Sequence, residues 1–120
     1  MKIRMDVEGG PLTASLDDTE AARDFVSLLP LALTLEDYAS TEKIADLPRK
    51  LSTKGAPAGT AAAAGDFSYY APWGNLALFY EPFRYSDGLV RLGTIDSGVE
   101  ALRRAGPLHV GIRLSEDEGR

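Results

Sequence analysis

Polar and apolar side chains alternate cleanly over the first part of the chain. Residues 2–7 place an apolar side chain at every second position, the period of two expected of a strand with one buried face. Residues 8–11 contain two glycines and a proline, which suit a turn, and the alternation resumes over residues 12–16. The pattern predicts a β-hairpin.

Residues 17–29 follow a helical period instead. Asp17 and Glu20 have the spacing of a capping box, in which side chains accept hydrogen bonds from free backbone amides at a helix start. Apolar positions then recur every three or four residues until Pro30, which we expect to end the helix. Alternation returns over residues 31–35 and predicts a third strand.

Residues 37–65 have no firm period, and we expect an irregular stretch. Residues 44–48 fit either one turn of helix or a bend. Residues 54–65 predict a mobile loop, because their run of alanines between glycines is too short to hold a helix. Loops of this length in compact domains often carry function.

The richest pattern is an aromatic hairpin. Strands over residues 67–70 and 75–80 flank a turn at residues 71–74, where a proline fixes φ. Residues 76–80 are apolar on both faces, so this strand is either covered on both sides or lines a pocket with one face. We expect residues 81–88 to form a loop.

The remaining pattern completes the fold. Residues 89–96 and 108–114 alternate as strands, and Ser97 and Glu100 have capping-box spacing for a short helix between them. Many alternating strands with two separated helices predict a mainly β fold, a closed or nearly closed barrel with two short covering helices.

Length and composition limit the chemistry. The 120 residues suit one domain, which we place at residues 1–114, followed by a charged tail at 115–120. A net charge of −5 without a basic cluster argues against a nucleic-acid partner. With no cysteine and one histidine, thiolate catalysis and the common zinc sites are excluded, and we expect neither a metal nor a cofactor.

The same composition bears on location. The amino-terminal residues lack the apolar core of a signal peptide. No apolar run approaches the ~18 residues that a membrane span needs. We expect a cytoplasmic protein without a membrane partner.

Aromatic residues gather in one part of the chain. Residues 67–85 hold eight of the ten, and Phe67 and Phe79 are predicted to belong to the barrel core. Aromatic side chains near turns and strand ends could instead wall an apolar pocket, with tyrosine hydroxyls orienting a ligand. The candidate ligand-binding residues are Trp73, Tyr80, Tyr85, Tyr38 and Tyr70.

Catalytic candidates are weaker. His109 falls on the outer face of its predicted strand, and Arg91 is predicted to be solvated. Tyr38, Glu42 and Lys43 could perform acid–base chemistry near a barrel mouth, but a solvated loop is the favoured interpretation. We therefore predict no catalytic residue and favour a protein that is not an enzyme.

Three segments carry a resemblance to a known family. They are the aromatic stretch at residues 65–80, the block at residues 92–102 and the final strand at residues 108–114. Together they resemble small bacterial proteins of the cyclophilin-like fold. The resemblance implies a fold and leaves the activity open, since one fold hosts many functions.

The chain departs from true cyclophilins at their catalytic stretch. Those enzymes isomerise X–Pro bonds with an arginine inside Phe-x-Arg-x-Ile-Pro-x-Phe-x-x-Gln-Gly-Gly-Asp. Arg49 follows Pro48 in the corresponding region, but the phenylalanine, glutamine and paired glycines are missing. No catalytic position carries over.

These observations favour a binding module. The aromatic hairpin and the segments at 37–65 and 81–88 would form an aromatic-walled cleft for a small molecule or short peptide. The alternative is a peptidyl-prolyl cis-trans isomerase with a reorganised active site. A third interpretation is a homo-oligomer formed through an exposed strand edge.

Overall fold

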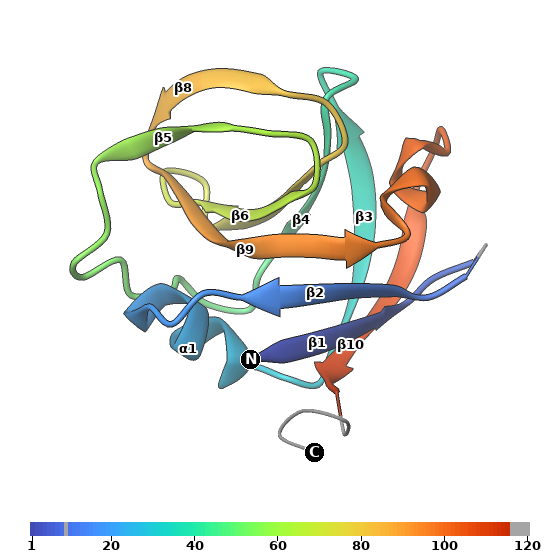
Figure 1. Ribbon diagram of the computed structural model, residues 1–120, viewed down its shortest axis with the longest axis horizontal. Coiled ribbons are helices and arrows are strands. Elements are labelled where there is room, and N and C mark those ends of the chain that lie inside the picture. Colours follow the sequence, from blue (N-terminus) through green and yellow to red (C-terminus); the bar gives the residue numbers. More distant parts are fainter. Residues whose placement is uncertain (9, 116–120) are drawn as a thin grey trace.

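The computed structural model describes residues 1–8 and 10–115 (Figure 1). Most of the tail predicted at 115–120 therefore lies outside the described residues. The elements in chain order are β1 (Lys2–Asp6), β2 (Leu12–Leu16), α1 (Glu20–Val26), β3 (Leu31–Tyr38), β4 (Glu42–Asp46), β5 (Gly59–Ala62), β6 (Asp66–Tyr70), β7 (Asn75–Phe79), β8 (Phe83–Asp87), β9 (Leu89–Ser97), the 3₁₀ helix η1 (Val99–Arg103) and β10 (Leu108–Leu114).

Eight of the strands close into a barrel in the order β1-β10-β3-β4-β7-β6-β9-β2. The predicted amino-terminal hairpin closes the ring, because β2 pairs antiparallel with β1 on one side and with β9 on the other. Strands β5 and β8 form a separate two-stranded sheet on the outside of the barrel, where β5 contacts β9 (Figure 1). The prediction of a mainly β, closed barrel is confirmed.

The two helices lie at opposite ends of the barrel (Figure 1). Helix α1 buries Phe25 completely, and its ring meets Phe67 edge-on with 5.4 Å between the centroids. At the other end, Leu102 of η1 is fully buried. The two helices therefore cover the interior that alternate residues of the strands fill.

Both predicted helix caps were wrong. Helix α1 begins later than expected, because the Thr19 hydroxyl accepts a hydrogen bond from the Ala22 amide at 3.2 Å. Asp17 pairs instead with Arg91 at 3.2 Å. At η1 the cap is Gly98, whose φ of +89° suits a residue without a side chain, and no side chain caps that helix.

Three strands were missed where the sequence predicts irregular chain. Strands β4 and β5 lie within residues 37–65, and β8 lies within the predicted loop at 81–88. Strand β5 consists of small residues, and β8 is half exposed, so neither shows clear alternation. In β4 two adjacent charged residues are both buried, which conceals the strand.

Lys43 is one of those buried charges, and the solvated loop predicted around it was wrong. Its side chain is fully buried, and its ammonium donates to the carbonyl oxygens of Arg104 and Gly106, each at 2.7 Å. The same ammonium forms an ion pair with Asp37 at 2.9 Å. These bonds satisfy the charge and tie the chain after η1 to the barrel wall.

Candidate functional site

The strand register brings three outward-facing side chains into one row. Tyr38 of β3 is opposite Glu42 of β4, and Glu42 is opposite Phe79 of β7. Lys43, the next residue after Glu42, points to the opposite face of the strand, which is the barrel interior. Both faces of β7 are buried, so each of the two predicted possibilities for this strand is realised: it is covered on both sides and its outer face lines a pocket.

A second row lies nearer the aromatic turn. Tyr70 of β6 is opposite Asn75 of β7 and Leu89 of β9. Trp73, in the turn between β6 and β7, meets Tyr70 edge-on at 5.3 Å between ring centroids and Tyr38 at 5.4 Å. We call Tyr38, Trp73 and Tyr70 the aromatic arch, because the indole joins the ends of β3 and β6.

The two rows and the arch enclose a cavity of about 230 Å³, here called the aromatic pocket. The aromatic hairpin contributes one part, the segments predicted as loops at 37–65 and 81–88 contribute most of the rest, and β9 contributes Leu89. The lining residues are Tyr38, Glu42, Tyr70, Trp73, Asn75, Phe79, Phe83, Arg84, Ser86 and Leu89.

Glu42 is the main polar feature of this pocket. The residue is 7% exposed, and within the described part of the chain its carboxylate has neither a hydrogen-bond donor nor an ion-pair partner. Burial raises the pKa of Glu42 to about 7, because removing a carboxylate from water disfavours its charged form. The carboxyl group is therefore poised to exchange a proton near neutral pH.

Asn75 adds a second unsatisfied acceptor. Its amide nitrogen donates to the carbonyl oxygen of Leu76 at 3.0 Å, which fixes the orientation of the amide group. The other amide atom, Oδ1, is buried and has no donor within the described residues. Buried polar atoms are nearly always hydrogen-bonded, so two acceptors without donors on residues that line one pocket are unusual.

Three of the five predicted ligand-binding residues meet in the pocket, and two do not. Tyr38, Trp73 and Tyr70 form the arch. Tyr80 is buried against the core, where burial and donation to Asp37 at 2.9 Å raise its pKa to about 12. Tyr85 is 55% exposed and is not among the lining residues.

The comparisons with known proteins agree with this architecture. The model of the cyclophilin-like family matches residues 5–113. The chain belongs to the cyclophilin-like family. The solution structure of a hypothetical protein from Archaeoglobus fulgidus is similar, with 17% identity, a TM-score of 0.72, and coverage of 96% of this chain and 95% of that one. At that identity the likeness shows the fold alone, and no curated protein matches the sequence.

Several lining residues of this cyclophilin-like protein were missed as members of a site. Glu42 was considered only for acid–base chemistry in a loop. Phe83 counted among the aromatic residues that could wall a pocket but was not chosen as a ligand contact, and neither Asn75 nor Arg84 was proposed as one. Recognising residues 42–46 as a strand would have found Glu42. Alternation places Glu42 on the face opposite to that of Lys43, and pairing with β3 places it beside Tyr38. Nothing in the sequence marks β8 as the cover of that face.

The weaker candidates of the sequence lie elsewhere. His109 is exposed, with its Nδ1 3.1 Å from the Thr34 hydroxyl. The Arg49 guanidinium forms an ion pair with Asp24 at 2.8 Å and is not among the residues that line the aromatic pocket. Neither side chain takes part in a constellation suited to catalysis.

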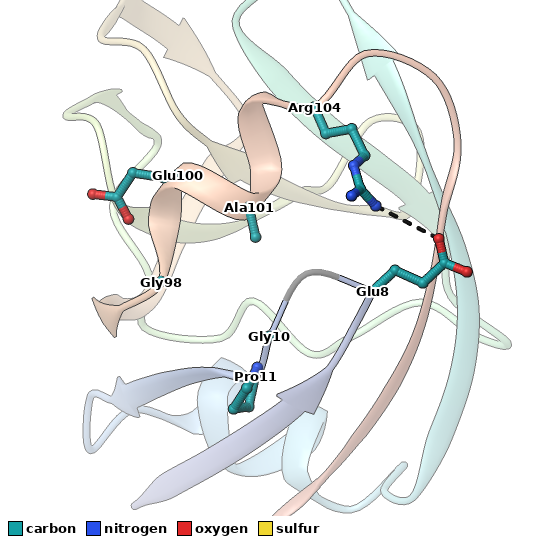
Figure 2. Close-up of a pocket in the computed structure, with 7 residues that line it drawn as sticks. All are labelled: Glu8, Gly10, Pro11, Gly98, Glu100, Ala101 and Arg104. Carbon is teal, nitrogen blue, oxygen red and sulfur yellow. Dashed lines mark ion pairs between the residues drawn. The ribbon is translucent and has the colours of Figure 1, made fainter.

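Two other cavities of this family member contain ion pairs. One of about 410 Å³ lies between η1 and the end of β1, where Glu8 and Arg104 reach toward each other at 3.5 Å (Figure 2). Figure 2 shows Glu100 pointing to the opposite side. The larger, about 630 Å³, lies beside α1, where Asp17 pairs with Arg91. The charged side chains that line them are all more exposed than Glu42, so neither cavity holds a comparable buried charge.

No three acidic or histidine side chains within residues 1–8 and 10–115 are grouped as a metal site would require. The helices of that same part of the chain include none with the length and apolar character to cross a membrane.

Proposed function

We propose that this member of the cyclophilin-like family is a binding protein whose aromatic pocket holds a small molecule or one side chain of a peptide. The observation that carries the proposal is the pairing of aromatic walls with two buried acceptors, on Glu42 and Asn75, that lack donors. Burying such groups unpaired costs stability, and a ligand that donates hydrogen bonds offsets that cost.

The size of the pocket limits the ligand. A volume of about 230 Å³ equals that of about eight water molecules at roughly 30 Å³ each. Sites for drug-sized ligands span roughly 300–1,000 Å³. The occupant is therefore a small metabolite or a single side chain, with any remaining part of the ligand outside.

Trp73 provides the test, because it is the only tryptophan and is 55% exposed. We expect saturable changes in its fluorescence when the protein is titrated with a panel of small metabolites and short peptides of positive, neutral and negative charge. For a ligand found in this way, Tyr70→Ala should weaken binding about fivefold in calorimetry, since an aromatic contact contributes about 1 kcal/mol.

Tyr85→Ala is the matched control, because Tyr85 is an exposed tyrosine outside the pocket. Its affinity should equal that of the unaltered protein. A panel without any response, or equal losses in the two variants, would overturn the proposal.

The isomerase alternative has less support. The arginine that the sequence offers, Arg49, donates to Asp24 and to the Ser27 hydroxyl, each at 2.8 Å. Its role is that of a link between α1 and the chain after β4.

A further inference from the structure

We propose that the ligand of the aromatic pocket is an organic cation, a protonated amine whose N–H groups donate to Glu42 and Asn75. The inference rests on the proposed function and names the chemical class that the site recognises. It follows from three features of the pocket: the direction of its missing hydrogen bonds, the aromatic faces around them, and the balance of charge on this side of the barrel.

The missing hydrogen bonds all require donors from the ligand. The Glu42 carboxylate only accepts, and the free atom of Asn75 is an oxygen because its nitrogen is held by Leu76. An amine supplies several N–H groups from one atom. A carboxylate or phosphate would supply none and would repel Glu42.

The walls favour positive charge. The faces of tryptophan and tyrosine rings attract cations, and tryptophan does so most strongly. In the arch, Trp73 lies edge-on to Tyr38 and to Tyr70, with interplanar angles of 86° and 82°. Phe79 adds a further ring beside Glu42 across the strand pair. Several aromatic rings and a carboxylate together bind a cation strongly, because the attraction of each group for the cation is stronger where water is excluded.

Acidic side chains outnumber basic ones when the lining residues are taken together with the outer faces of β3 and β4, beyond the pocket itself. Arg84 is the cation in its lining, and that side chain is exposed and lies over the Phe83 ring, 5.2 Å from its centroid. On the same outer face, Glu36 and Asp46 are exposed carboxylates of β3 and β4. With Glu42 they place three acidic groups against one basic group, and the buried one is screened least.

The experiment compares probes of one shape and different charge. Benzylamine, benzyl alcohol and benzoate are titrated at about pH 8 against the unaltered protein, followed by Trp73 fluorescence and calorimetry. We expect benzylamine to bind at least about tenfold more tightly than benzyl alcohol, since a charge-assisted hydrogen bond exceeds a neutral one. Benzoate should bind most weakly.

Two variants test whether Glu42 is the source of the preference for benzylamine. Glu42→Gln keeps the shape of the side chain and should remove the preference for benzylamine over benzyl alcohol. Asp46→Asn is the matched control, an exposed carboxylate on the same strand, and should retain the preference. Circular dichroism confirms that each variant is folded.

The outcomes separate this inference from the proposed function. If benzyl alcohol or benzoate binds as tightly as benzylamine, or if Glu42→Gln keeps the preference, the amine assignment is wrong and a binding pocket still stands. If neither these probes nor the wider panel change Trp73 fluorescence, the proposed function itself is overturned.

Discussion

Glu42 and Lys43 are adjacent in the sequence and have opposite situations in the fold. Lys43 is fully buried, yet Asp37 and two carbonyl oxygens satisfy its ammonium. Glu42 is nearly as buried and has no such partner within the described residues. A buried charge without a partner lowers stability, so Glu42 is the residue whose removal should strengthen the fold.

The pKa of Glu42 sets the pH dependence. In the folded protein it is about 7, above the ordinary 4.5, so the native state holds the proton more tightly than the unfolded chain. The free energy of unfolding should therefore fall as pH rises from about 4.5 to about 7 and then level off. Replacing Glu42 by glutamine should remove this slope and stabilise the protein at about pH 8 by up to about 3 kcal/mol.

Urea unfolding at several pH values between about 4 and 8 provides the measurement. The two proteins should have nearly equal stability at the acid end and should diverge toward neutral pH. Parallel curves would mean that Glu42 finds a partner in the folded protein.

The sequence pattern did not reveal which charged residues are buried. Glu42 and Lys43 were assigned to a solvated loop because charged side chains are seldom buried without partners. Two of the three partners of Lys43, the carbonyl oxygens of Arg104 and Gly106, come from a segment about sixty residues away, which no local pattern reveals. The aromatic arch was partly predictable, since Tyr38, Tyr70 and Trp73 were chosen for their places at turns and strand ends.

At the scale of elements, strands with large apolar side chains were predictable, whether one face or both faces are buried, and strands of small or polar residues were not. Strands β1, β2 and β10 alternate cleanly in burial and were predicted closely. Strand β5 lacks large side chains because it packs tightly against β8, and β8 is polar because it faces solvent on one side. Both belong to the sheet that covers the aromatic pocket.

Gly59 controls the fit of that covering sheet. A Cβ added there would overlap the carbonyl oxygen of Ser86 and the hydroxyl of Tyr85. Gly59→Ala should therefore displace β8, which carries Phe83 and Ser86 into the pocket, and should weaken ligand binding about tenfold or more while the barrel stays folded.

The control for this substitution is Gly111→Ala in β10, where an added Cβ meets nothing within 4 Å. Calorimetry with the best ligand of the panel compares the two variants. Equal affinities would show that the covering sheet takes no part in the site.

At the scale of the whole molecule, closure of the barrel depends on the contact between β2 and β9. Gly93 lies at this contact, and a Cβ there would overlap the Ser15 carbonyl oxygen and lie 2.7 Å from the Cα of Leu16. Gly93→Ala should lower the free energy of unfolding by about 1–3 kcal/mol or more, because backbone atoms must move.

Thermal and urea unfolding would measure this loss, with Gly111→Ala again as the reference for an alanine in an open position. If Gly93→Ala were as stable as Gly111→Ala, β2 and β9 would be able to move apart without any loss of stability. The closed ring also bears on assembly. Each of its eight strands has a neighbouring strand on both sides, so β5 and β8 are the strands most readily available for an oligomer built through a strand edge.

The aromatic arch has a consequence for how the chain folds. Tyr38 belongs to the hairpin of β3 and β4, and Trp73 to the hairpin of β6 and β7, so the two rings meet only after β4 has paired with β7. A partly folded chain with both hairpins formed but undocked has no pocket. Any ligand therefore binds the native barrel and not its precursors, and by mass action it draws the population toward the completed fold.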